Sequence, residues 1–114
     1  AVIAIENFQS DFPDSGYNEE LAYLKVDAQY NLAKSSLPSK QKERYLDVLK
    51  FHRAFVDKYP NSRYGRDAEK LYADSQKELE RIIKQEEEIQ KLREQQENAP
   101  NAPARISTSG AQPK

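Results

Sequence analysis

Hydrophobic residues recur at helical spacing along the first part of the chain. Residues 1–12 carry them at spacings of four, three and four, as Ala1, Ile5, Phe8 and Phe12. This spacing places side chains on one face of an α-helix. Pro13 ends the block, so we expect a first helix over residues 1–12.

The second and third blocks predict two further helices. Residues 16–35 carry two apolar stripes, one of Tyr17, Leu21, Leu24, Ala28 and Leu32, the other of Tyr23, Val26, Tyr30 and Ala33. A helix with two apolar stripes has two neighbours. Helical spacing returns over residues 40–59, which Pro60 closes. Between these blocks Pro38 disfavours helical geometry in the residue before it, and Ser39 can cap the helix that follows.

The fourth block predicts one long helix over about residues 63–98 with two unlike halves. Its first half has the hydrophobic spacing of a core-facing helix. From Glu80 onward only Ile82, Ile83, Ile89 and Leu92 interrupt charged and polar residues. We expect this second half to extend past the body as a partner-binding or capping arm. Residues 99–114 are rich in Pro, Ser, Ala and Asn without an apolar period, which predicts a disordered tail.

Composition removes several classes of function. Charged residues make up 32% of the chain but nearly cancel to a net charge of -1, which argues against nucleic acid as a partner. The absence of cysteine excludes thiolate metal sites and thiol catalysis. No apolar run approaches the roughly 20 residues that span a bilayer. Because the sequence begins inside a helical pattern without methionine, we expect an upstream part, with any export signal, to be missing.

No residue pattern points to catalysis or to a cofactor. The only histidine, His52, has Val48 and Val56 as its neighbours one turn away, so it is expected to be a packing residue. Ser15 and Ser62 each stand two residues after a proline, where a turn or cap role outweighs a nucleophilic one. We therefore expect no enzyme, no catalytic or metal-binding residues and no cofactor.

An internal repeat relates the two aromatic-proline turns. NFQSDFPDSGYNEE aligns with AFVDKYPNSRYGRD at an offset of 47 residues, the separation of Pro13 and Pro60. An aromatic residue precedes each proline, and an Asx-Ser pair follows it, with a tyrosine two residues later. In this chemistry the proline stops one helix and a side-chain oxygen receives the open N–H groups at the start of the next.

These repeats resemble the tetratricopeptide repeat. The positions that carry the resemblance are Tyr23, Val26 and Tyr30 on a first helix, and Phe8, Phe55, Pro13 and Pro60 at the ends of second helices. The stretches FPDSGYNEELAYLK, SKQKERY and KYPNSRYGRDAEKLY are also similar to the later repeats of the BamD-like outer-membrane assembly lipoproteins. The resemblance implies an all-α solenoid of tetratricopeptide-like repeats over residues 1–98, with a long last helix.

The same resemblance implies a function. It is that of a protein-protein interaction scaffold on the periplasmic face of the outer membrane, bound to the outer-membrane insertase and to other subunits of the β-barrel assembly complex. Membrane attachment would come only from a lipid anchor outside this chain, and the chain itself is expected to be a monomer. Two alternatives remain open: a periplasmic repeat scaffold of the cell-envelope or division machinery, and a structural coiled-coil module that oligomerises through the Ile82–Leu92 segment.

Two sets of residues are candidates for partner binding. Leu21, Leu24, Ala28, Asn31 and Leu32 fall where first helices of the repeat family face the ligand groove. The alternative is that they pack on a helix of a preceding repeat, which we favour slightly because a rich apolar stripe is costly to expose. The second set is Ile82 and Ile89, seven residues apart on the fourth helix.

Overall fold

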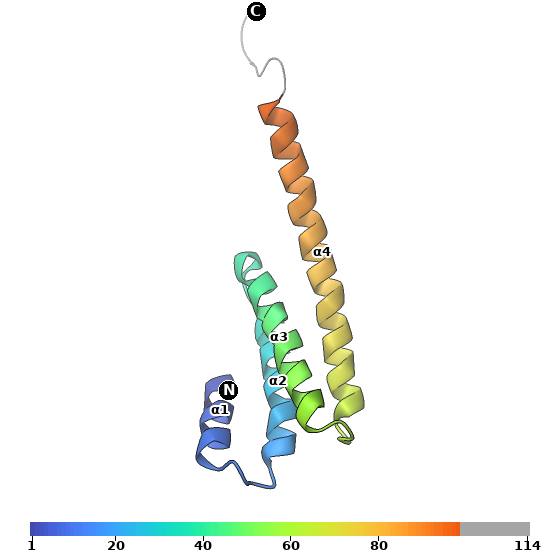
Figure 1. Cartoon of the computed structure of the whole chain (residues 1–114). Helices are drawn as coiled ribbons and strands as arrows, with labels where there is room; N and C mark the ends of the chain where they lie inside the picture. The colour runs from blue at the N-terminus through green and yellow to red at the C-terminus, as the bar shows by residue number, and fades with distance from the viewer. Residues whose placement is uncertain (99–114) are drawn as a thin grey trace, which may run out of the picture. The chain divides into compact units, whose positions relative to one another are not determined.

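The computed structural model describes residues 1–98, and these residues form four α-helices without a strand (Figure 1). The helices are α1 (Val2–Asp11), α2 (Asn18–Lys34), α3 (Pro38–Lys58) and α4 (Gly65–Glu97). The expected all-α class is thereby confirmed. The chain divides into two compact units, residues 1–80 and residues from 81 onward, so α4 contributes to both. The tail expected over residues 99–114 lies outside the described residues.

Residues 1–80 are organised around an antiparallel pair of helices, α2 and α3, with α1 beside α2 (Figure 1). The buried residues of the described part of the chain come from α2, α3 and the first half of α4: Asn18, Val26, Gln29, Ala33, Tyr45, Val48, Phe55, Ala68, Ser75 and Leu79. The two apolar stripes of the second block predicted two neighbours for α2, and α2 does contact both α1 and α3.

The start of α3 corrects the sequence expectation. The helix begins at Pro38 rather than after Ser39, and Leu37 before it has extended backbone angles, φ -61° and ψ 147°. Proline suits the first helical position because its missing N–H group would have no partner there and its φ is already helical. Ser39 therefore lies inside the first turn and is not the cap. Similarly, α2 begins at Asn18, so Tyr17 stands just before the helix.

The two aromatic-proline turns have the same backbone geometry, which confirms the internal repeat. The N–H of Phe12 donates to the carbonyl of Phe8 at 2.8 Å, and the N–H of Tyr59 donates to the carbonyl of Phe55 at 2.8 Å. The helix-ending residues share their angles, φ -130° and ψ 65° at Phe12 and φ -129° and ψ 65° at Tyr59. One local sequence pattern thus builds one turn twice.

The serine of each turn acts on the turn itself. The Ser15 hydroxyl accepts the N–H of Tyr17 at 3.2 Å, and the Ser62 hydroxyl accepts the N–H of Tyr64 at 3.1 Å. Each serine therefore satisfies an N–H just before the helix and is not the formal capping residue. Among residues 1–98, the Ser62 hydroxyl is the one of the two that also bonds a helix that does not flank its turn, because it donates to the Glu19 carboxylate of α2 at 2.6 Å.

This difference gives a paired prediction. Ser62→Ala should lower the free energy of unfolding by about 1–2 kcal/mol, because it removes a hydrogen bond to a charged group as well as the turn bond. Ser15→Ala removes the turn bond alone and should cost about 0.5–1 kcal/mol. Urea denaturation of both variants measures the difference, and equal losses would show that the contact with Glu19 adds nothing.

Candidate protein-binding surfaces

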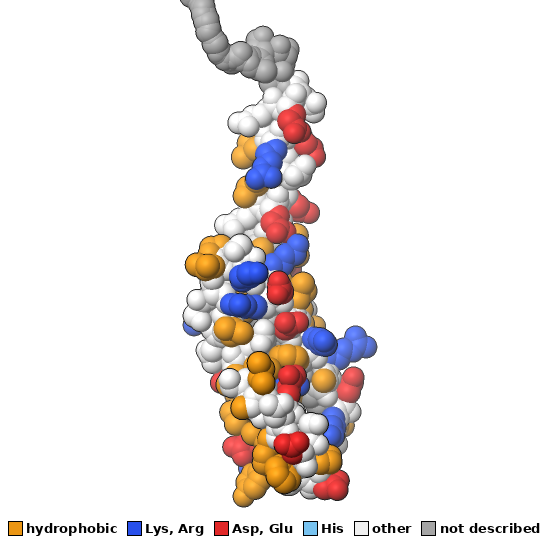
Figure 2. Space-filling model, turned by 90° about the vertical axis from the view of Figure 1, so that its left-hand side faces the viewer, with side chains coloured by type: hydrophobic (Ala, Val, Ile, Leu, Met, Phe, Trp, Pro, Cys, Tyr) orange, Lys and Arg blue, Asp and Glu red, His pale blue; other side chains and the backbone are white. Residues whose placement is uncertain are grey.

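Two apolar depressions lie side by side on α1 and the start of α2. One, of about 460 Å³, is lined mainly by hydrophobic residues of both helices, and the other, of about 490 Å³, lies over the Pro13 turn. Phe8 and Tyr17 line both. We call Ile5, Phe8, Tyr17, Leu21 and Leu24 the α1–α2 end surface. Figure 2 shows hydrophobic side chains gathered toward the lower end of the view, where α1 and the start of α2 lie.

The internal repeat relates the partly exposed face of α2 to a buried face of α4. The offset of 47 residues pairs Tyr17 with Tyr64, Leu21 with Ala68, Ala28 with Ser75, and Leu32 with Leu79. Ala68, Ser75 and Leu79 are buried on α4, and the Tyr64 ring stacks on that of Tyr23 with centroids 5.3 Å apart. By contrast Tyr17 is 69% exposed and Leu32 is 44% exposed. Thus α2 repeats, position by position, a helix face that is buried on α4, but leaves it only partly covered.

Another face of α4 is exposed although the equivalent positions on α2 pack in the core or are half-buried. Positions equivalent to Glu19, Tyr23, Val26 and Tyr30 are occupied by Arg66, Lys70, Ala73 and Lys77. These four residues are exposed, whereas Val26 is fully buried. Repeat stacks commonly end in a polar outer face because the last repeat has no further neighbour. Within residues 1–80, the stack therefore has a polar face on α4 and an apolar one at α1–α2.

The residues of the first candidate set are distributed along α2. Leu21 and Leu24 line a depression together with Ile5 and Phe8 of α1. Ala28 is half-buried and Leu32 is 44% exposed. The Asn31 side chain is exposed, and its amide donates to the Asp27 carbonyl within α2 at 3.0 Å. Leu21 and Leu24 thus belong to the end surface, whose α1 and turn members the sequence reasoning did not include in the set.

The second candidate set lies on the distal part of α4, in the unit that begins at Arg81. Ile82 is half-buried, and Ile89 is 50% exposed. Leu92 is 60% exposed, and every residue from Ile83 to Asn98 is exposed. A row of exposed aliphatic side chains on a polar helix is a common form of contact surface for a partner.

His52 packs on an aromatic ring. Its imidazole stacks on Tyr72 of α4 with ring centroids 4.5 Å apart. Burial lowers the pKa of His52 below its usual 6.5, and the nearby Glu69 opposes this effect. Within residues 1–98 no group of three or more potential ligands could hold a metal ion. The expected packing role of His52 is confirmed.

The lowered pKa predicts how stability depends on pH. Because the unfolded chain binds the His52 proton at a higher pH than the folded chain, the stabilisation is complete above pH 6.5 and is lost as pH falls through the folded pKa. A His52→Gln variant should therefore show a shallower fall in the free energy of unfolding between about pH 7.5 and 5.5. Urea denaturation at several pH values measures both slopes, and identical slopes would exclude this effect.

Most of the sequence matches a known protein family. A family model described as YfiO, outer membrane lipoprotein, matches residues 1–108. No curated protein matches the chain. In the described part of the chain, none of the helices is long and apolar enough to cross a membrane.

Proposed function

The chain belongs to the YfiO family of outer membrane lipoproteins, the BamD-like family that its turns resemble, and we propose that it is a non-catalytic scaffold for outer-membrane β-barrel assembly. In this role it would hold the periplasmic part of the outer-membrane insertase and other subunits of the assembly complex. Family membership also supports a location on the periplasmic face of the outer membrane. A lipid anchor outside this chain would provide the attachment.

The exposed apolar residues of the α1–α2 end surface are the main structural support for this proposal. Exposed apolar area is costly in water, and a contiguous patch on a soluble domain commonly marks a contact with another protein. The internal repeat indicates what kind of contact this surface makes, because the equivalent positions on α4 are buried by packing within the chain. We infer that an α-helix packs on the end surface and continues along α2. Its contact positions on α2 would be Leu21 and Leu24 of the end surface, followed by Ala28 and Leu32.

The distal part of α4 supports a second contact rather than self-association. A stable coiled coil needs apolar residues repeated over three or four heptads. Only Ile82 and Ile89 are separated by seven residues in this segment, and Gln85 and Gln96 interrupt the pattern. We therefore infer that Ile82 and Ile89 contact a different protein and that the chain is a monomer.

A binding experiment with the whole chain tests the proposal. We expect the immobilised chain to retain the purified periplasmic domains of the insertase, and light scattering to show a monomer across a range of concentrations. Leu24→Lys should weaken capture because Leu24 lies in the end surface and is already 38% exposed, so the fold should tolerate the change. Leu46→Lys is the matched control, because Leu46 is 49% exposed and lies on α3.

The outcomes separate the possibilities. Failure to retain any periplasmic domain of the insertase would contradict the adaptor role. A mass that rises with concentration would favour the coiled-coil alternative. Unchanged capture by Leu24→Lys would assign the end surface to another repeat of the stack, the interpretation that the sequence slightly favoured, and would leave the distal part of α4 as the partner contact.

A further inference from the structure

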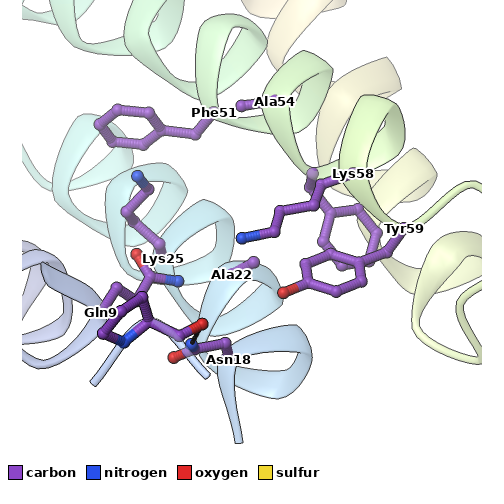
Figure 3. A pocket seen from close by; sticks show the side chains of 10 residues that line it. Gln9, Asn18, Ala22, Lys25, Phe51, Ala54, Lys58 and Tyr59 are labelled. Atoms are coloured by element: carbon purple, nitrogen blue, oxygen red, sulfur yellow. Dashed lines mark hydrogen bonds between the residues drawn. The ribbon is translucent and has the colours of Figure 1, made fainter. Parts of the chain in front are cut away.

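A small cavity of about 180 Å³, lined by polar and apolar residues, opens between α1, α2 and α3 (Figure 3). It shares only Pro13 with the two depressions of the end surface. Its polar lining comes from α1 through Gln9, from α2 through Asn18 and Lys25, and from the end of α3 through Lys58 and Tyr59. Phe51, Ala22 and Ala54 form apolar parts of the wall. The cavity is therefore a site of mixed chemistry, unlike the apolar end surface.

Asn18 carries a buried acceptor without a donor. The side chain is 4% exposed, and its amide nitrogen donates to the carbonyls of Phe12 at 2.9 Å and Pro13 at 3.0 Å. These two bonds fix the orientation of the amide. Its oxygen, Oδ1, is buried and has no hydrogen-bond partner within residues 1–98. This oxygen is shielded from the cavity, so Asn18 forms a fixed part of the wall and the binding of a ligand falls to the other polar groups.

The same cavity has a positive lining. The ammonium of Lys25 lies 4.5 Å from the centre of the Phe51 ring and 3.4 Å from a carboxylate oxygen of Glu6. The Lys58 ammonium forms no ion pair with a carboxylate of the described residues, and no acidic residue lines the cavity. Figure 3 shows the Lys58 ammonium and the Tyr59 hydroxyl pointing into the same space near Ala22. An ammonium and a hydroxyl that converge in this way suit an anion.

We propose that this cavity binds an acidic side chain, aspartate or glutamate, from a protein partner. The carboxylate would accept hydrogen bonds from the Lys58 ammonium and the Tyr59 hydroxyl. A volume of about 180 Å³ has room for one such side chain with its peptide group and none for a nucleotide. The site depends on the scaffold function only in that the ligand belongs to a protein.

The test uses the whole chain and a minimal probe. N-acetyl-glutamate methylamide offers one side-chain carboxylate and two backbone N–H groups, and its glutamine analogue has a neutral carboxamide of similar size in place of the carboxylate. We expect the glutamate probe to cause saturable shifts in the amide NMR signals of Ala22, Ala54 and Tyr59, with at least tenfold weaker binding of the glutamine probe. Equal binding of the two probes, or shifts that never saturate, would overturn the proposal.

Variants and a second anion make the test specific. Lys58→Gln and Tyr59→Phe should each weaken the glutamate probe several-fold, because each removes one group expected to bind the carboxylate while keeping most of the side chain. Lys50→Gln is the matched control, since Lys50 is exposed on the same helix and does not line the cavity. Unchanged binding by Lys58→Gln, or equally tight binding of inorganic phosphate, would overturn the assignment to an acidic side chain. Loss of insertase capture with intact probe binding would contradict the scaffold function alone.

Discussion

Phe55→Ala should lower the free energy of unfolding by about 3–5 kcal/mol, the usual cost of replacing a buried aromatic ring by a methyl group. Phe55 is 2% exposed, and its ring centroid lies 6.0 Å from that of Tyr59. Its carbonyl also accepts the N–H that closes the turn. The substitution keeps this backbone bond but leaves a cavity in the core where the ring was buried. Urea denaturation measures the loss.

Phe8→Ala is the internal control, because Phe8 occupies the same position in the first repeat. Its carbonyl receives the equivalent turn bond at 2.8 Å, but its side chain is only half-buried. We therefore expect a smaller loss, about half that of Phe55→Ala, since less surface leaves water at this position. Losses of equal size would mean that the turn, rather than the burial of the ring, determines the cost.

The sequence predicted the repeated turn because that turn depends on residues close together in the chain. An aromatic residue, a proline, a serine and a tyrosine within a few positions determine where one helix ends and where the next N–H groups find partners. Both copies adopt the same geometry for this reason. Ser39 was assigned wrongly because Pro38 can itself begin a helix, and local propensity favours both interpretations.

The cavity could not be predicted from the sequence, because its groups meet only through the packing of three helices. In the sequence, Asn18 is a typical residue for the start of a helix, and Lys58 is a typical cationic residue for the end of one. Their convergence depends on the register of α2 against α3, which helical periodicity does not give. Burial of Gln29, whose amide donates to the Arg44 carbonyl at 3.3 Å, was missed for the same reason.

The repeat also explains why burial differs between equivalent residues. Tyr17 and Tyr64 close identical turns, yet only the ring of Tyr64 stacks on Tyr23. The sequence pattern identifies both tyrosines as packing residues, and the presence of a neighbouring helix decides which one is covered. An exposed member of such a pair is therefore evidence for a contact surface, because its partner shows which face the fold can bury.

Exchange of Ile82 and Ile89 for aspartate should weaken capture of the insertase periplasmic domains by tenfold or more, while the chain stays folded and monomeric. Burial of one large aliphatic side chain contributes about 1.5–3 kcal/mol, and a factor of ten in binding corresponds to about 1.4 kcal/mol. The fold should tolerate the change because Ile89 is 50% exposed and Ile82 is half-buried on α4.

A variant of equal charge provides the control. Gln90→Asp with Gln95→Asp adds the same two negative charges to the same exposed helix segment, but at positions rotated away from the line of Ile82 and Ile89. If apolar contact drives the interaction, this variant should bind as tightly as the unmodified chain. Equal weakening by both variants would assign the effect to charge repulsion. Unchanged capture by the Ile82→Asp, Ile89→Asp chain would remove the distal part of α4 from the interface, and the α1–α2 end surface would then have to carry the contact.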